Sequence, residues 1–119
     1  MPEPKLVNGS QLYVLWRFQK SGQYQEAISS YQDAINIDPN NIKIHNNLGN
    51  ALQNLNKDQE AISCYHKVIQ IDPNNVKARN NLGYSLKKLN KHQEAIRCFH
   101  AAVQKEPNNL TSHWLSMNT

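Results

Sequence analysis

The feature that most constrains this chain is an internal repeat, in which one long phrase returns 34 positions later. The segment from Asn46 to Asn75 reads NNLGNALQNLNKDQEAISCYHKVIQIDPNN, and the segment from Asn80 to Asn109 reads NNLGYSLKKLNKHQEAIRCFHAAVQKEPNN. A long fixed period is the signature of a fold in which one supersecondary unit stacks on the next.

Proline marks the end of each unit. Pro39, Pro73 and Pro107 each follow an acidic residue and precede two asparagines. Proline cannot continue a helix and disfavours helical geometry in the residue before it, whereas an asparagine side chain can cap the next helix start. We therefore expect new helices directly after three asparagines: Asn41, Asn75 and Asn109.

Two helices are predicted between successive prolines. In the middle unit Leu48, Leu52 and Leu55 recur at helical spacing, and after a break so do Ala61 and Tyr65. Each pattern gives one apolar stripe on a helix. The unit is therefore a helix, a turn and a second helix.

The turns inside the units fall at Gly22, Asn56 and Asn90, residue types that tolerate the left-handed backbone often found at helix ends. The predicted helices span residues 9–21, 24–37, 43–55, 58–71, 77–89 and 92–105, with a short helix after residue 110.

The unit resembles the tetratricopeptide repeat, through its period and through Leu48-Gly49, Ala61, Tyr65 and Pro73. The next unit carries the same pattern as Leu82-Gly83, Ala95, Phe99 and Pro107. The resemblance implies an all-α fold, a right-handed α-solenoid of three helix–turn–helix repeats with a short C-terminal capping helix. In such a repeat Gly49 and Gly83 are expected to face Ala61 and Ala95 where two helices cross closely.

The repeats divide the chain into an N-terminal arm (1–7), a degenerate first repeat (8–41), a second repeat (42–75), a third repeat (76–109) and a C-terminal capping segment (110–119). The first repeat has Leu15 where the others have glycine, and Ser21 where they have leucine. The capping segment offers apolar residues to cover the third repeat: Leu110, Trp114 and Leu115.

The resemblance implies a concave binding groove lined by the first helix of each repeat. Asn47 and Asn81 are expected to form a ladder along it, because an amide offers donors and an acceptor to an extended peptide backbone. A general asparagine bias would explain the same residues without a binding role. The predicted groove positions are Lys43, Asn46, Asn47, Asn50, Gln53, Asn54, Lys77, Asn80, Asn81, Tyr84, Lys87, Lys88, Leu12, Tyr13, Trp16, Gln19 and Lys20.

An acidic peptide is the expected ligand class. Some members of the family grip a terminal carboxylate; Asn47 and Lys77 match that pattern, whereas Leu12, Trp16 and Asn81 do not. A looser preference for acidic peptides remains, since the third repeat has seven basic residues against two acidic ones.

Other function classes lack support in the sequence. The basic residues are not interleaved with stacking aromatics, which argues against nucleic acid. Catalytic and nucleotide motifs such as GxGxxG or HExxH are absent, so we expect no enzyme, cofactor or metal site. The start, MPEPKLVNGS, has no apolar signal-like stretch, and no segment is apolar enough to span a membrane. We expect a cytoplasmic protein in which Cys64 and Cys98 are structural thiols rather than a disulfide.

The function favoured by the sequence is a non-enzymatic protein–protein interaction module that binds an extended peptide. One alternative is a structural module that self-assembles, including a homodimer through apolar residues of the first helix: Leu12, Tyr13 and Trp16. Another is the repeat region of a larger protein, such as a glycosyltransferase.

Overall fold

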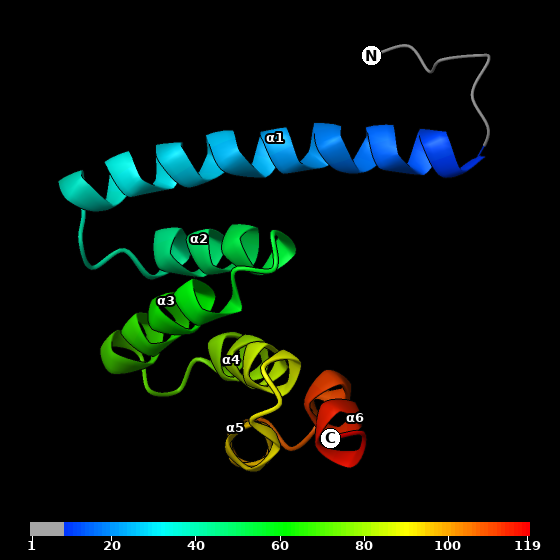
Figure 1. Cartoon of the computed structure of the whole chain (residues 1–119). Helices are drawn as coiled ribbons and strands as arrows, with labels where there is room; N and C mark the ends of the chain where they lie inside the picture. The colour runs from blue at the N-terminus through cyan, green and yellow to red at the C-terminus, as the bar shows by residue number, and fades with distance from the viewer. Residues whose placement is uncertain (1–8) are drawn as a thin grey trace.

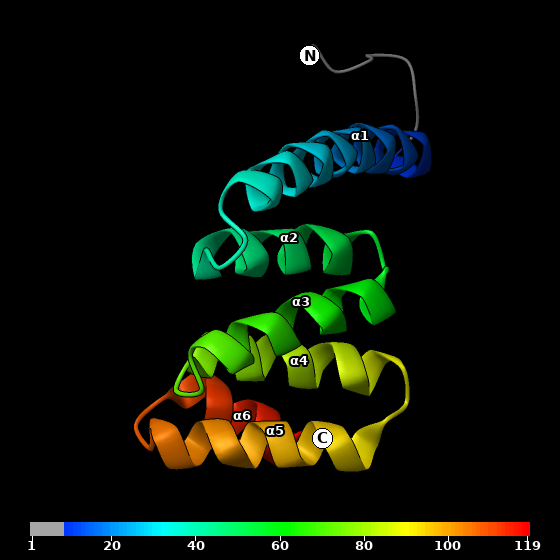
Figure 2. The same cartoon turned by 90° about the vertical axis from the view of Figure 1, so that its left-hand side faces the viewer.

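The computed structural model of the chain describes the backbone of residues 9–119 and the side chains of residues 19–119. Within residues 9–119 the chain forms six α-helices and no strand: α1 (Gly9–Ile37), α2 (Ile42–Asn54), α3 (Asp58–Ile71), α4 (Val76–Lys88), α5 (His92–Lys105) and α6 (Leu110–Met117). Helices α1 to α5 stack in chain order, and α6 packs on α5 (Figures 1 and 2). The predicted all-α solenoid of helical hairpins is confirmed.

The second and third repeats form the predicted hairpins, α2 with α3 and α4 with α5, and their helix bounds agree with the prediction to within one residue. Asn41, Asn75 and Asn109 cap α2, α4 and α6, because each side-chain oxygen accepts a hydrogen bond from the backbone N–H three residues on. Asn56 and Asn90 adopt the left-handed backbone in the turns, with φ of 59° and 63°. The predicted roles of these five asparagines are confirmed.

Inside each hairpin a glycine faces an aromatic ring. A Cβ at Gly49 would lie 2.7 Å from Cε1 of Tyr65, and one at Gly83 would lie 2.5 Å from Cε1 of Phe99. Both rings are fully buried. The atoms nearest to each glycine thus belong to the ring one turn after the expected alanine, and this ring fills the crossing.

The first repeat differs from the prediction of two helices with a turn at Gly22. Residues 9–37 form the single helix α1, and no glycine in the described chain has a positive φ. The second half of α1 packs on α2, whereas the first half extends past the end of α2 (Figure 1).

The sequence of the first turn explains why α1 runs straight. Leu55 and Leu89 anchor the other two turns by packing against the core, and Ser21 has no comparable apolar side chain. Leu15 stands where Gly49 makes room for the Tyr65 ring, so a hairpin as tight as the others would drive Leu15 into Tyr31. A glycine inside a helix costs only ~0.5–1 kcal/mol relative to alanine. That is less than the cost of a turn without its buried leucine or of overpacking Leu15 against Tyr31.

The capping helix α6 covers the third repeat with fewer apolar residues than predicted. Leu115 packs against the core and Ser112 is fully buried. Leu110 and Trp114 lie on the opposite side of α6, with exposed fractions of 84% and 59%. The expectation that these two residues cover the third repeat is wrong, because the side of α6 that faces inward carries Ser112 instead.

Candidate functional site

The predicted groove residues described by the structure lie on α2 and α4, the first helices of the second and third repeats. We call the surface they share the α2–α4 face. It comprises Lys43, Asn47, Asn50 and Gln53 of α2 and Lys77, Asn81, Tyr84 and Lys88 of α4. The side chains of Tyr13 and Trp16, and of Leu12, lie outside the described residues.

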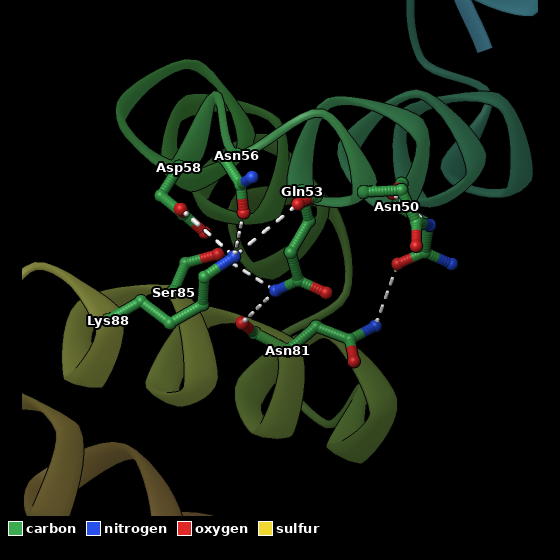
Figure 3. A network of polar contacts seen from close by, with 8 residues as sticks. Asn50, Gln53, Asn56, Asp58, Asn81, Ser85 and Lys88 are labelled. Carbon is green, nitrogen blue, oxygen red and sulfur yellow. Dashed lines mark hydrogen bonds and ion pairs between the residues drawn. The ribbon is translucent and has the colours of Figure 1, made fainter. Parts of the chain in front are cut away.

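Asn50 is the centre of a hydrogen-bond network between the repeats (Figure 3). Its Oδ1 accepts a hydrogen bond of 2.7 Å from the Tyr65 hydroxyl and one of 3.2 Å from Nδ2 of Asn81. Asn81 is therefore paired with Asn50 and not with Asn47. Asn47 is half-buried, and the described chain offers its amide no hydrogen-bond partner.

Gln53 and Lys88 also join α2 to α4 (Figure 3). Nε2 of Gln53 donates to the Asn81 backbone oxygen at 3.2 Å and to Oγ of Ser85 at 2.8 Å. Nζ of Lys88 lies 3.2 Å from Oδ2 of Asp58, which is buried at the start of α3. These two side chains hold the repeats together, so they are less free for a ligand than the sequence suggested.

Asn46 and Asn80 are buried, with exposed fractions of 7% and 8%. The expectation that both are exposed in the groove is therefore wrong. The Asn80 amide faces the capping helix α6, since its Nδ2 donates to Oγ of Ser112 at 2.8 Å. Oδ1 of both asparagines has no hydrogen-bond partner in the described chain, which leaves a buried acceptor at each position.

Lysine and tyrosine side chains remain exposed on the face. Lys43 and Lys77 are exposed at the start of α2 and α4, and Tyr84 has an exposed fraction of 44%. The ammonium of Lys88 lies 5.6 Å from the centroid of the Tyr84 ring, within the range of a cation–π contact. The face therefore presents positive charge beside one aromatic surface.

A pocket of about 350 Å³ opens between the start of α4 and the start of α6. It contains the exposed Lys77, the half-buried Asn81 and the buried Asn80 with its unpaired Oδ1. The sequence did not indicate that α6 contributes to the site; one more 34-residue step, from Val76 at the start of α4 to Leu110, would have found it. The pocket is lined by Val76, Lys77, Asn80, Asn81, Glu106, Asn109 and Thr111.

The two cysteine side chains are packed in the fold, Cys64 buried and Cys98 half-buried. Cys64 and Cys98 are free thiols, as predicted, and burial raises the pKa of both. Among residues with described side chains, no three His, Cys, Asp or Glu residues are grouped as metal ligands. None of the helices in that part of the chain has the length and hydropathy of a membrane span.

Family models match most of the chain. A TPR repeat model matches residues 17–56, and a tetratricopeptide repeat model matches residues 42–75 and 76–109. The chain belongs to the tetratricopeptide repeat family. Similar solved structures include tetratricopeptide repeat (TPR) domains. The Arabidopsis OM64 TPR domain is 29% identical over 84% of this chain and 83% of its own, with a TM-score of 0.77.

Two similar TPR domains were solved with peptides. The first TPR of Spaghetti (RPAP3), bound to the HSP90 peptide SRMEEVD, is 25% identical over 97% of this chain and 94% of its own, with a TM-score of 0.78. The second TPR domain of human RPAP3, in complex with the HSP70 peptide SGPTIEEVD, is 28% identical over 85% of this chain and 84% of its own, with a TM-score of 0.77. A comparison with curated proteins found no match.

Proposed function

We propose that this chain is a non-catalytic interaction module that holds an extended, acidic peptide segment on the α2–α4 face. The observation that carries the proposal is the pocket between α4 and α6, where the exposed Lys77 lies beside Asn80 and Asn81. A lysine ammonium can pair with a peptide carboxylate, and the half-buried Asn81, whose Nδ2 bonds to Asn50, keeps its side-chain oxygen to accept a hydrogen bond from a peptide N–H.

Asn47 extends the proposed site from the pocket onto α2. Its amide has no partner in the described chain, so it can exchange a donor and an acceptor with one peptide unit of the ligand. Asn50 holds Asn81 in place through the hydrogen bond between their side chains. The proposal assigns peptide contacts to five residues: Asn47, Asn81, Lys43, Lys77 and Tyr84.

Two of the similar structures support an acidic ligand, since the peptides in them end in Glu-Glu-Val-Asp. The present chain has Asn81 at a position where the sequence pattern of carboxylate-gripping members has a basic residue. The α2–α4 face therefore offers Lys77 and Lys43 as cations, with amides between them. We infer that it prefers acidic segments and makes fewer charged contacts to a terminal carboxylate.

Fluorescence anisotropy with a labelled peptide ending in Glu-Glu-Val-Asp tests the proposal. Lys77→Ala should weaken binding by about tenfold, because a charge-assisted hydrogen bond is lost. Lys105→Ala removes the same charge from an exposed position in the last turn of α5, outside the pocket, and is the matched control. Equal affinity of Lys77→Ala and Lys105→Ala would show that the pocket is not the peptide site.

An amidated form of the same peptide separates two ways of binding. If the α2–α4 face grips backbone amides and acidic side chains, amidation should change the affinity less than Lys77→Ala does. A complete loss of binding on amidation would instead assign Lys77 to a terminal carboxylate.

A further inference from the structure

One side of the second half of α1 is only partly covered, and we call it the open face of α1. Ala27, Tyr31 and Ala34 form it, at helical spacing, and all three are half-buried. At the equivalent places in the other two repeats every side chain is fully buried: Ala61, Tyr65 and Val68 in α3, and Ala95, Phe99 and Ala102 in α5. The first repeat therefore lacks a contact that both complete repeats have.

The missing contact is the one made by the first helix of the same repeat. In the complete hairpins α2 covers this side of α3 and α4 covers this side of α5, with the rings seated against Gly49 and Gly83. In the described chain the main contact of α1 is with α2, where Ile28 is buried and part of Tyr31 packs against the core. That contact covers the open face only in part, since Ala27, Tyr31 and Ala34 all stay half-buried.

The segment that corresponds to the missing helix is residues 9–21, and α1 carries it away from the open face. It continues straight past the end of α2 (Figure 1). Its sequence has an apolar stripe of Val14, Leu15 and Phe18. Each copy of the chain therefore has one partly covered helix face. It also has a helical segment, residues 9–21, that corresponds to the first helix covering the same face in the other two repeats.

We propose that two copies of this chain pair through α1, with the helices antiparallel. Residues 9–21 of each copy then cover the open face of the other. At 1.5 Å per residue, these 13 residues span about 20 Å, enough to cover the span of about 10 Å from Ala27 to Ala34. The contact is reciprocal and closes around a twofold axis. Without the short turn as a tether, the two helices can sit at the ordinary separation of ~8–10 Å that Leu15 requires.

The second copy is the occupant that fits best, because it covers both unpaired segments at once. If residues 9–21 folded back on their own chain, Leu15 would be driven into Tyr31, and the turn would lack the leucine that Ser21 replaces. The proposal concerns the half-buried side of α1, next to its contact with α2, and it does not depend on peptide binding to the α2–α4 face.

Sedimentation across a concentration series tests the pairing. The parent should change from monomer to dimer and stop there. Ala27→Arg should weaken dimerisation about tenfold or more, because it places an unpaired charge in the contact. Ser29→Arg makes the same addition at an exposed position on another side of α1 and should leave the dimer intact. A parent that stays monomeric, or equal loss of the dimer in both variants, would overturn the proposal.

A second variant tests the origin of the open face without adding a charge. Leu15→Gly combined with Ser21→Leu restores the residues of the other repeats, and should let residues 9–21 fold back and return the chain to a monomer. Far-ultraviolet circular dichroism checks that the variants fold. A double variant that still dimerises as the parent does would contradict the account, as would assemblies larger than a dimer that Trp114→Arg abolishes.

Discussion

Gly49 and Gly83 show how one residue type sets the closeness of a hairpin. Each lies against a fully buried ring, and the space that a Cβ would need is already occupied. The surrounding rings cannot move outward because Tyr65 and Phe99 have no exposed surface. A side chain at either glycine must therefore separate two helices.

Gly83→Leu should lower the free energy of unfolding by ~1–3 kcal/mol through overpacking. The cost falls near the upper end of that range, since the neighbour is a buried ring, and it exceeds the gain of up to ~1 kcal/mol in helix propensity. Urea unfolding followed by circular dichroism measures the difference. An unchanged unfolding midpoint and slope would show that the α4–α5 crossing has room to adapt.

Cys64 should make the stability of the folded chain depend on pH in the alkaline range. Burial, with a smaller contribution from Glu60, raises the pKa of the thiol from 9.0 to about 11. Burial also raises the pKa of Tyr65. Because the pKa of Cys64 is higher in the folded chain than in the unfolded chain, its contribution to stability is complete below pH 9 and is lost as pH rises toward 11.

Unfolding in urea at a series of pH values from 8 to about 11 should therefore show stability falling over this window. Cys64→Ala should make the decline shallower, while the contribution of Tyr65 remains. Rapid labelling of Cys64 by a thiol reagent in the folded chain at pH 8, at the rate seen in denaturant, would contradict the burial of the thiol.

Among the elements, α1 marks the limit of what repeat period can predict. The period, the prolines and the asparagine caps predicted α2 to α6 because the same residues occur in the same places. In the first repeat two residues differ, Leu15 and Ser21, and the hairpin does not form. Periodicity identifies equivalent positions in the repeats. Whether a hairpin forms also depends on whether the side chain at each position fits the space between the two helices.

The same limit applies to the candidate site. The sequence identified the exposed Lys43 and Lys77 and the half-buried Asn47. It did not show that Asn46 and Asn80 are buried, because position on a helix does not reveal how much of that helix its neighbours cover. Nor did it show the pairing of Asn50 with Asn81, which depends on the offset between α2 and α4.

Gly22→Ala tests whether α1 is one helix. With nothing within 4 Å of the added methyl group, the substitution should stabilise a continuous helix by ~0.5–1 kcal/mol. In a hairpin with a left-handed residue at position 22 the same change would destabilise the chain. Thermal unfolding of the two proteins at one low concentration distinguishes these results by the sign of the shift.

At the scale of the whole molecule, the repeats divide their polar residues between two tasks. Asn50, Gln53, Asn81 and Lys88 connect α2 to α4. Lys43, Asn47 and Lys77 are not used in this way in the described chain. A rigid backing of hydrogen bonds behind a row of free polar groups suits an extended ligand, because little ordering is needed when the ligand binds.

Amide chemical-shift mapping during a titration tests most directly whether a peptide binds across α2 and α4. With a peptide ending in Glu-Glu-Val-Asp, the largest changes should gather at Lys43 and Asn47, at Lys77 and Asn81, and at the start of α6. The changes should saturate with peptide and be weakened in Lys77→Ala. Changes confined to α3 and α5, or none at millimolar peptide, would contradict the account.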